Sequence, residues 1–525
     1  MSRALGSDRF QFRVVIALGL LLALAVRLMT SNYSFWFDEW ASLIFSDQPV
    51  ANLWSRWMVR ETNPPLFYTA LKFWALLGAH NIVTLRLLPI LAGVINIAII
   101  TWLCARYHSR RAAVIVVLLI AVSLRHVYMS QLLRGYIFAM LGASLSLAGI
   151  MLWWDSERRK VLGMTAYVLG VTLAFYSHTT MALLQFAAPL GVLLVRQREV
   201  RAGNWQIVRD LLFMGFAAAA ASGWWVWISY LQLSGDSLNI TWIEKKGLLR
   251  VLSSFVRNGT PLNLNVDLPT LAAYRPHGFE DITKLSQIPA WITIEVASLC
   301  FIVAVSIWSV GKSLNKAFTR LSLYIFTIVI LLHWVAAYLH PITTDLTIAW
   351  LMLFVFIGLA TSIAGISKRA LRSGLVVVTV GILALNTITH RGQLELQDWR
   401  GALSRVSSAG NSGLLVQSEP MLVITQRACK FQFALPGCPF RLVGLHSESR
   451  LDSWARNMAD QPPVQAEEAV SRLRDLDSVY TLRHWSYDPL VELGHSTTIP
   501  RTSWHSAFFE GPFPANSFAV PNRSR

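Results

Sequence analysis

Two adjacent carboxylates, Asp38 and Glu39, lie within the aromatic stretch FWFDEWASLIF, residues 35–45. Because this stretch follows a strongly apolar run, ionised carboxylates are costly here unless a partner or a reaction uses them. Acids beside a span are often only solvated loop residues, but the flanking aromatic residues indicate that Asp38 is not freely solvated. Asp38 and Glu39 are therefore candidate catalytic residues. A carboxylate pair can also hold a divalent cation such as Mg²⁺ or Mn²⁺, although two adjacent acids alone do not define a metal site.

Further polar and ionisable side chains stand at the ends of apolar runs, where separate loops can bring them to one face of a membrane. Arginines at such positions can belong to a site at that face, and they can equally anchor the chain at the membrane surface. Acids and amides before a Pro-Pro helix start can bind a ligand or simply cap the helix. The predicted substrate-binding residues are Glu61, Asn63, Arg86, Arg134, Tyr136 and His178.

The composition indicates a membrane protein. Of 525 residues, 54% are hydrophobic and 14% are charged, whereas a soluble domain carries about 25% charged residues. Apolar runs of the length that crosses a bilayer, roughly 17–25 residues, recur from Val14 to Ile388. The first run lacks a signal-peptide cleavage site and is kept as a span.

The net charge of +17 has its source in short loops between the apolar runs, such as CARYHSRR and RQREVRAGNWQIVRD. This distribution is typical of loops that stay on the cytoplasmic side of a membrane. The chain contains no nucleic-acid-binding motif, so we expect a membrane lipid environment and no nucleic-acid partner.

If the basic loops lie in the cytoplasm, the chain has about eleven predicted spans. The N-terminus is then inside and the C-terminus outside. The helix around residues 64–86 is predicted to be interfacial or re-entrant, since a crossing there would put CARYHSRR outside. The outer segments then include 31–86, which carries the two acids, and a long loop, 232–289, predicted to shape the substrate site. The predicted spans are 14–30, 87–104, 112–128, 136–154, 161–177, 179–195, 211–231, 290–310, 321–339, 346–366 and 372–389.

From about residue 390 the composition becomes more polar. GNSGLLVQSEPMLVITQ contains a turn and two short runs that are typical of strands, and QPPVQAEEAVSRLRDL has the spacing of a helix. Cys429 and Cys438 can form a short disulfide if this part is extracytoplasmic. The predicted fold is therefore a polytopic α-helical membrane domain, 1–389, followed by a small extracytoplasmic α/β domain, 390–525.

Several of these segments resemble one known superfamily. FWFDEWAS and ETNPPLFYTALKFWALLGAHNIVTLRLLPILAG are similar to the N-terminal signature of GT-C glycosyltransferases that use polyprenyl-phosphate sugars. The relatives most alike are the protein O-mannosyltransferases and the lipid A aminoarabinose transferases. SQLLRGYIFAM, FYSHTTMALLQF and LQDWRGALSRV resemble later segments of the same proteins. The resemblance is good over residues 14–200 and loose elsewhere.

The resemblance implies a multi-pass protein of the bacterial inner membrane with its site on the outer face. Asp38 would be the catalytic carboxylate, and Arg134 and Arg86 would stabilise the lipid phosphate that leaves. The donor would be a polyprenyl-phosphate-linked sugar, and the acceptor a protein, a glycolipid or a polysaccharide. One departure is Asn63, because the family commonly has His or Lys there, so the donor sugar and the acceptor stay open.

Two alternatives belong to other classes. A flippase or carrier for a lipid-linked sugar, or a polysaccharide export component, would carry charged residues midway along several spans and often duplicated halves. Here the span interiors are nearly free of charge and no duplication is visible. A non-catalytic assembly protein with a sensory outer domain is a third interpretation, which Asn63 leaves open.

Overall fold

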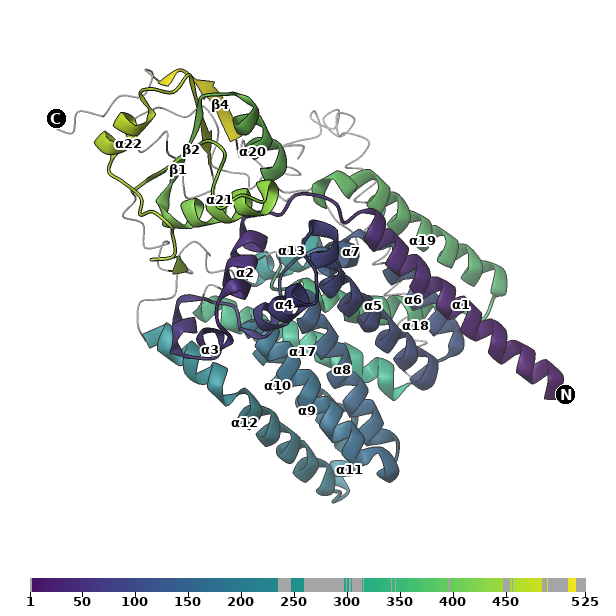
Figure 1. The fold of residues 1–525 in the computed structure, drawn as a ribbon. Helices are drawn as coiled ribbons and strands as arrows, with labels where there is room; N and C mark the ends of the chain where they lie inside the picture. Colours follow the sequence, from purple (N-terminus) through teal and green to yellow (C-terminus); the bar gives the residue numbers. More distant parts are fainter. Residues whose placement is uncertain are drawn as a thin grey trace, which may run out of the picture.

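The computed structural model places a bundle of long helices next to a small α/β domain, and α2 and α4 lie between the two (Figure 1). The structure describes residues 2–234, 247–258, 316–394 without 341 and 345, 397–446, 457–483 and 509–515, with a few isolated positions. The predicted span 290–310 falls almost entirely outside this part of the chain. So does most of the loop 232–289, of which α13 (Leu248–Asn258) is described.

Seven helices of the described residues are long and apolar enough to cross a membrane, or eight if a bent pair counts as one span. The polytopic membrane class is thereby confirmed, whereas the count of eleven stays a prediction. Two predicted spans, 179–195 and 346–366, coincide with shorter apolar helices, α10 (Ala182–Val195) and α18 (Met352–Ala364). The seven are α1 (Ser2–Met29), α5 (Ile82–Tyr107), α8 (Tyr136–Asp155), α9 (Lys160–Ser177), α12 (Gln206–Ser234), α17 (Ala317–Leu339) and α19 (Arg369–His390).

The predicted span 112–128 is not one continuous helix: it breaks into α6 (Arg110–Val122) and α7 (Leu124–Gln131), bent by 66°. A break frees backbone carbonyls that need new donors. The buried guanidinium of Arg27 lies 3.4 and 3.3 Å from the carbonyl oxygens of Ile120 and Ala121. Thr387 Oγ1 donates to the Val122 carbonyl at 2.5 Å. Contacts from two distant helices thus stabilise the bend, which sends α7 and the loop after it toward α2.

Helices α8 and α9 pack with their backbones in contact. A Cβ atom at Gly142 would lie 2.5 Å from the backbone nitrogen of Ala174 and from the carbonyl oxygen of Gly170. Gly149 and Gly163 meet backbone on the partner helix in the same way. Small residues allow this close approach inside a membrane. Because Tyr136 begins α8 and His178 follows α9, the packing also holds these two residues together.

The first outer segment forms α2 (Phe37–Asp47), α3 (Val50–Leu53), the 3-10 helix η1 (Arg56–Arg60) and α4 (Leu66–Leu76). Helix α4 follows the Pro-Pro pair and has 11 residues, which is too short to cross a bilayer. Phe73 and Leu76 on it are exposed. This agrees with the predicted interfacial or re-entrant helix.

The C-terminal part contains a four-stranded sheet in the order β2-β1-β3-β4. Strand β1 (Ser412–Gln417) is parallel to β2 (Arg441–Leu445) and β3 (Ser478–Leu482), and β4 (Phe509–Phe513) is antiparallel to β3. Helices α20 (Trp399–Ser408), α21 (Ser418–Phe433) and α22 (Ala466–Leu473) accompany the sheet. The α/β architecture and the helix in QPPVQAEEAVSRLRDL agree with the prediction.

One element of this part was predicted wrongly. The run MLVITQ forms the middle of α21 and not a second strand. Its β-branched residues favour a strand locally, but the buried residues Met421, Ile424 and Ala428 have helical spacing and pack in one apolar cluster with β1. Tertiary packing here overrides local propensity. Near the end of this helix, Cys429 forms a disulfide with Cys438.

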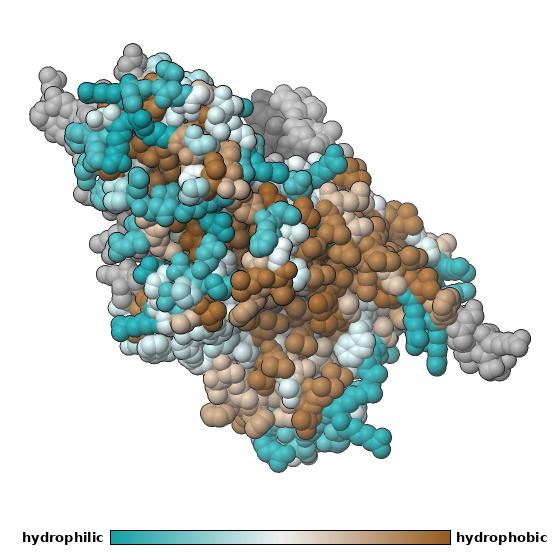
Figure 2. Space-filling view, in the orientation of Figure 1, coloured by the Kyte–Doolittle hydropathy of each residue, from teal (hydrophilic) through white to brown (hydrophobic). Residues whose placement is uncertain are grey.

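The surface reflects the two parts of the chain. Figure 2 shows hydrophobic residues over the helical bundle, and hydrophilic residues over the C-terminal domain and at the opposite end of the bundle. The N-terminus and α11 (Gln197–Arg201) lie at the end of the bundle away from that domain (Figure 1).

Candidate functional site

Asp38 lies in the first turn of α2, at the junction of the bundle and the C-terminal domain. Its side chain is 33% exposed, and its Oδ2 lies 3.6 Å from Nη2 of Arg134. Arg134 Nη1 also approaches the backbone oxygen of Asp38 at 3.4 Å. A separation of 3.6 Å is longer than a hydrogen bond. The carboxylate of Asp38 is therefore both accessible and next to a cation, without being saturated by it.

Glu39 points the other way, into the protein. Both of its carboxylate oxygens accept from Arg86 Nη2, at 3.0 and 2.9 Å, and both side chains have zero exposure. The backbone N–H of Leu133 donates to Glu39 Oε1 at 3.0 Å. Arg86 donates in turn to the carbonyl oxygens of Ser31 and Tyr33, at 2.8 and 2.7 Å. This pair thus joins α2 to the loop before it and to the loop that carries Arg134.

The buried pair bears on two sequence predictions. Glu39 was predicted to be catalytic and Arg86 to bind substrate, but each is fully buried and bonded to protein groups. We therefore assign both to positioning Asp38 and Arg134, and not to contact with a ligand. A salt bridge of this kind needs all of its hydrogen bonds to offset the desolvation of the two charges.

The loop Leu132–Gly135 brings Arg134 and Tyr136 against the turn that contains His178. A Cβ atom at Gly135 would collide with the carbonyl oxygen of Ser177, so glycine is required for this approach. The rings of Tyr136 and His178 are 5.2 Å apart and tilted by 34°. The structure therefore brings three predicted site residues together from α8, the loop before it and the end of α9.

His178 has a defined tautomer in this turn. The backbone N–H of Thr180 donates to its Nδ1 at 3.3 Å, and the hydroxyl of Thr180 lies 2.8 Å from the same nitrogen. Nδ1 is therefore the acceptor, and in the neutral ring Nε2 carries the hydrogen. Burial, assisted by the charge of Arg134, lowers the pKa of His178 to about 3, so the ring is a neutral donor at physiological pH.

A chain of polar contacts runs from Arg134 away from Asp38. Arg134 Nη1 lies 3.4 Å from the hydroxyl of Tyr68, which donates to Glu61 Oε1 at 3.2 Å. The same oxygen of Glu61 accepts from the backbone and side-chain nitrogens of Asn63, at 2.9 and 2.7 Å. Asn63 thus braces Glu61. Sequence reasoning missed Tyr68. The signal that could have found it is its place in the first turn of α4, directly after the Pro-Pro pair that follows Glu61.

Arg134 stays charged in this setting. Burial opposes its charge, but the nearby hydroxyl of Tyr68 and the carboxylate of Asp38 raise the pKa of Arg134 well above its ordinary value. Burial raises the pKa of Glu61, while Arg134 and the hydrogen bonds from Asn63 act in the opposite direction. The site therefore combines one permanent cation, one exposed carboxylate and one buried carboxyl group.

The residues do not fit the divalent cation considered from the sequence. Among the described residues, no group of three or more His, Cys, Asp or Glu side chains could hold a metal ion. Glu39 is committed to Arg86, and the neighbour of Asp38 is itself a cation. The two adjacent acids therefore do not act as a metal-binding pair.

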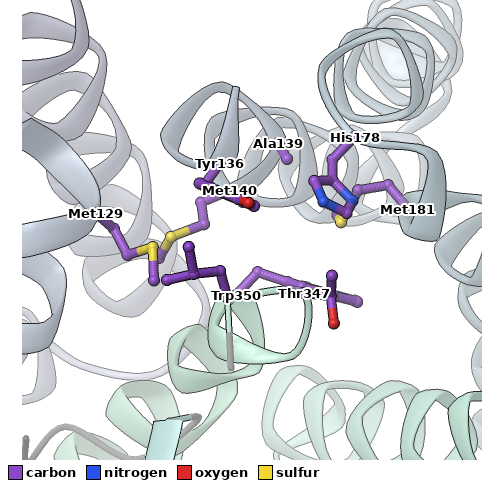
Figure 3. Close-up of a pocket in the computed structure, with 9 residues that line it drawn as sticks. Met129, Tyr136, Ala139, Met140, His178, Met181, Thr347 and Trp350 are labelled. Carbon is purple, nitrogen blue, oxygen red and sulfur yellow. The ribbon is translucent and has the colours of Figure 1, made fainter. Parts of the chain in front are cut away.

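A small apolar pocket adjoins the Tyr136–His178 contact (Figure 3). It lies between α7, α8, the turn after α9 and the segment that leads into α18. Methionine side chains on its wall can repack around different shapes. Its lining residues are Met129, Tyr136, Ala139, Met140, His178, Met181, Leu346, Thr347 and Trp350.

No family model matches the chain, and no curated protein sequence matches it. Among solved structures, ArnT from Cupriavidus metallidurans bound to undecaprenyl phosphate is 12% identical, with 93% of this chain and 96% of that chain covered and a TM-score of 0.46. The Archaeoglobus fulgidus oligosaccharyltransferase in the apo form is 12% identical, with 92% and 70% covered and a TM-score of 0.49. The arabinofuranosyltransferase AftD from Mycobacteria is 14% identical, with 90% and 35% covered and a TM-score of 0.45.

These structures are GT-C glycosyltransferases, the class that the sequence motifs resemble. Because the identities are low and the TM-scores modest, the case for a function rests on the geometry of the site itself.

Proposed function

We propose that this chain is a membrane glycosyltransferase that moves a sugar from a polyprenyl-phosphate donor to a hydroxyl group of an acceptor. The observation that carries the proposal is the pairing of Asp38, an accessible carboxylate, with the buried cation of Arg134 at 3.6 Å. Sugar transfer from a lipid phosphate needs both groups together: one takes the proton of the acceptor, and the other stabilises the phosphate that leaves.

In the proposed reaction the acceptor oxygen attacks the anomeric carbon while Asp38 accepts the hydroxyl proton. The bond from that carbon to the phosphate oxygen breaks, and its electron pair leaves with the lipid phosphate. Arg134 balances the charge that develops on the leaving phosphate. The Nε2–H of the neutral His178 ring is a second donor for that phosphate. Because a phosphate is already a good leaving group, no strong general acid is required. A single displacement of this kind inverts the anomeric centre.

We propose that the site faces the extracytoplasmic side of a bacterial inner membrane. The basic loops near α11 and the N-terminus lie at the far end of the bundle from the C-terminal domain (Figure 1), and such loops are retained in the cytoplasm. The Cys429–Cys438 disulfide suits an oxidising compartment. Under this proposal residues 1–389 form the membrane domain, and residues 390–525 form the periplasmic domain.

A site at the membrane boundary suits a donor that is held by its lipid. The acceptor class, whether protein, glycolipid or polysaccharide, is left to experiment. Asn63 donates two hydrogen bonds to Glu61, at the position where the superfamily that the sequence resembles commonly has His or Lys. The phosphate charge would therefore be met by Arg134 alone among the predicted site residues.

The test uses purified protein in liposomes, a panel of radiolabelled polyprenyl-phosphate sugars and a membrane extract as acceptor. Asp38→Asn keeps the shape of the side chain and removes its charge, and we expect transfer to fall about 10²–10⁴-fold with donor binding retained. The matched control is Glu468→Gln on α22, which also turns a carboxylate into an amide and breaks a pair with Arg472 at 2.6 Å, and it should transfer like wild type. Labelled lipid that crosses the bilayer equally in all three proteins, with no transfer, would establish the carrier alternative instead.

A further inference from the structure

The N-terminus of α2 is held by a residue from the far end of the chain. Gln397 Oε1 accepts from the backbone N–H of Phe37 at 2.9 Å and from Trp399 Nε1 at 3.0 Å. Gln397 is only 6% exposed, and it lies in the segment between the last membrane helix and the C-terminal domain. The N–H of Phe37 is one of the first donors of a helix, which have no partner within the helix.

The side chain of the residue before α2 cannot supply this hydrogen bond. Trp36 precedes the helix, and an indole ring has a donor but no acceptor. Glu39 reaches back, but it accepts from the N–H of Trp36 at 3.2 Å. The N–H of Phe37 donates instead to Gln397, and Phe37 has further contacts besides. The cap of the helix that carries Asp38 thus comes from the C-terminal side of the chain.

The residues beside Gln397 strengthen this attachment. Arg400 donates through its guanidinium to the side-chain and backbone oxygens of Asn32, at 3.2 and 3.1 Å. Its backbone N–H donates to Ser34 Oγ at 3.3 Å. Trp399 is fully buried, and its ring meets that of Trp40 at 6.4 Å. The segment therefore contacts the chain both before and after Asp38.

Helix α21 makes a second line of contact along α2. The ring of Phe431 packs edge-on against Phe35 at 5.7 Å and against Trp40 at 5.6 Å. At the other end of α2, Arg427 pairs with Asp47. The C-terminal domain thus touches α2 at both ends, while the membrane helices hold it through Glu39.

We propose that the C-terminal domain clamps the catalytic helix, and that Gln397 is a positioning residue for Asp38. This inference rests on the proposed function, because it takes Asp38 to be the reacting carboxylate. Without Gln397 the hydrogen bond from the N–H of Phe37 to this side chain is lost, and the first turn of α2 is held less firmly. Asp38 sits in that turn, and small displacements of a reacting group cost a large part of its rate. The domain is then part of the catalytic apparatus and not a separate module.

The experiment compares three variants of the full chain in nanodiscs. Gln397→Met removes the acceptor and keeps the length of the side chain. Gln397→Glu keeps an acceptor, at a helix N-terminus where negative charge is favoured. Asp398→Ala is the matched control, because the Asp398 carboxylate caps α20 by accepting from the Gly401 N–H at 2.8 Å and, among the described residues, has no hydrogen bond or ion pair with α2.

Two measurements are made on each variant. Hydrogen exchange of peptides that cover residues 33–45 reports the opening of α2 without reference to catalysis. Steady-state transfer gives kcat and the KM for the donor. For Gln397→Met we expect faster exchange in α2 and a kcat lowered by about tenfold to a hundredfold, with a donor KM within about twofold of wild type. Gln397→Glu should recover most of kcat, and Asp398→Ala should match wild type in both measurements.

The outcomes separate this proposal from the proposed function. Faster exchange of α2 in Gln397→Met supports the clamp even if no sugar transfer is found for wild type, in which case the transferase proposal alone fails. Wild-type exchange and wild-type kcat in Gln397→Met would overturn the clamp. If that variant does not fold, Arg400→Gln removes the partly exposed contacts with Asn32 and should give the same pattern at smaller amplitude. An unchanged exchange profile in Arg400→Gln would also overturn it.

Discussion

The buried pair of Glu39 and Arg86 yields a sharp quantitative prediction. In Glu39→Gln the side chain keeps its shape but loses its charge, and its amide hydrogens now face groups that also donate. Arg86 and the N–H groups of Leu133 and Trp36 all donate to Glu39 in the wild type. The substitution therefore leaves a buried cation without its counter-charge and at least one N–H without an acceptor.

The expected cost follows from burial. Removing one partner of a fully buried ion pair destabilises a protein by about 3–5 kcal/mol, and both side chains here have zero exposure. The matched control is Glu468→Gln, which removes an exposed pair with Arg472 one helical turn away. Pairs of that kind contribute about 0.3–0.5 kcal/mol. The two glutamates should therefore differ about tenfold in their effect on the free energy of unfolding.

The assay is reversible denaturation of the purified protein in mixed micelles, followed for wild type, both single variants and a cycle with Arg86→Met. We expect a coupling free energy between Glu39 and Arg86 of at least about 1 kcal/mol. If Glu39→Gln lowers the free energy of unfolding no more than Glu468→Gln does, the buried pair does not hold α2 to the loop that carries Arg134. The positioning role assigned to Glu39 is then wrong.

The remaining predictions concern charge, pH and sidedness. Arg134→Gln should lower sugar transfer about 10²–10³-fold, measured with the donor that wild type accepts; wild-type rates would exclude it from phosphate stabilisation. Because burial raises the pKa of Glu61 above 4.5, its charged form is disfavoured in the folded state, so the stability gained by Glu61→Gln should grow as pH rises through that raised pKa. A gain in stability that shrinks as pH rises would mean that folding lowers the pKa of Glu61 instead of raising it. Since the pKa of His178 is about 3, rates between about pH 5 and 8 should show no inflection that His178→Phe removes. Cysteines placed at Asn63 and Gln426 should react with an impermeant maleimide from the same side of the membrane, and one at Arg201 from the other.

The sequence was informative where composition and charge decide the structure. Hydropathy predicted the membrane class, and the positions of the basic loops led to a non-crossing helix at 66–76. The change in composition near residue 390 led to the prediction of an α/β part, and the structure contains its sheet. These signals are local, so a reading of the chain in order can find them.

The errors arose where distant contacts decide the structure. The apolar run 112–128 contains neither Pro nor Gly, and it bends because Arg27 and Thr387 satisfy the carbonyls at the break. Asp38 and Glu39 are adjacent in sequence, but successive residues of a helix point about 100° apart. Packing therefore exposes the first and buries the second. Nothing in the local sequence of Gln397 indicates that it caps a helix 360 positions earlier.

The glycine contacts between α8 and α9 have a consequence for how genetic variation in this chain should be interpreted. Gly163 lies fifteen positions before His178, roughly 22 Å along a helix, and a methyl group there would strike the backbone nitrogen of Trp153. The two helices would then splay from that end, and the rings of Tyr136 and His178 would move apart at the other. A random-mutagenesis map scored for activity should therefore show two clusters of sensitive positions, one around Asp38 and one at these glycines. Inherited substitutions at these glycines would lower activity by moving Tyr136 and His178 apart, although the glycines themselves lie outside the site.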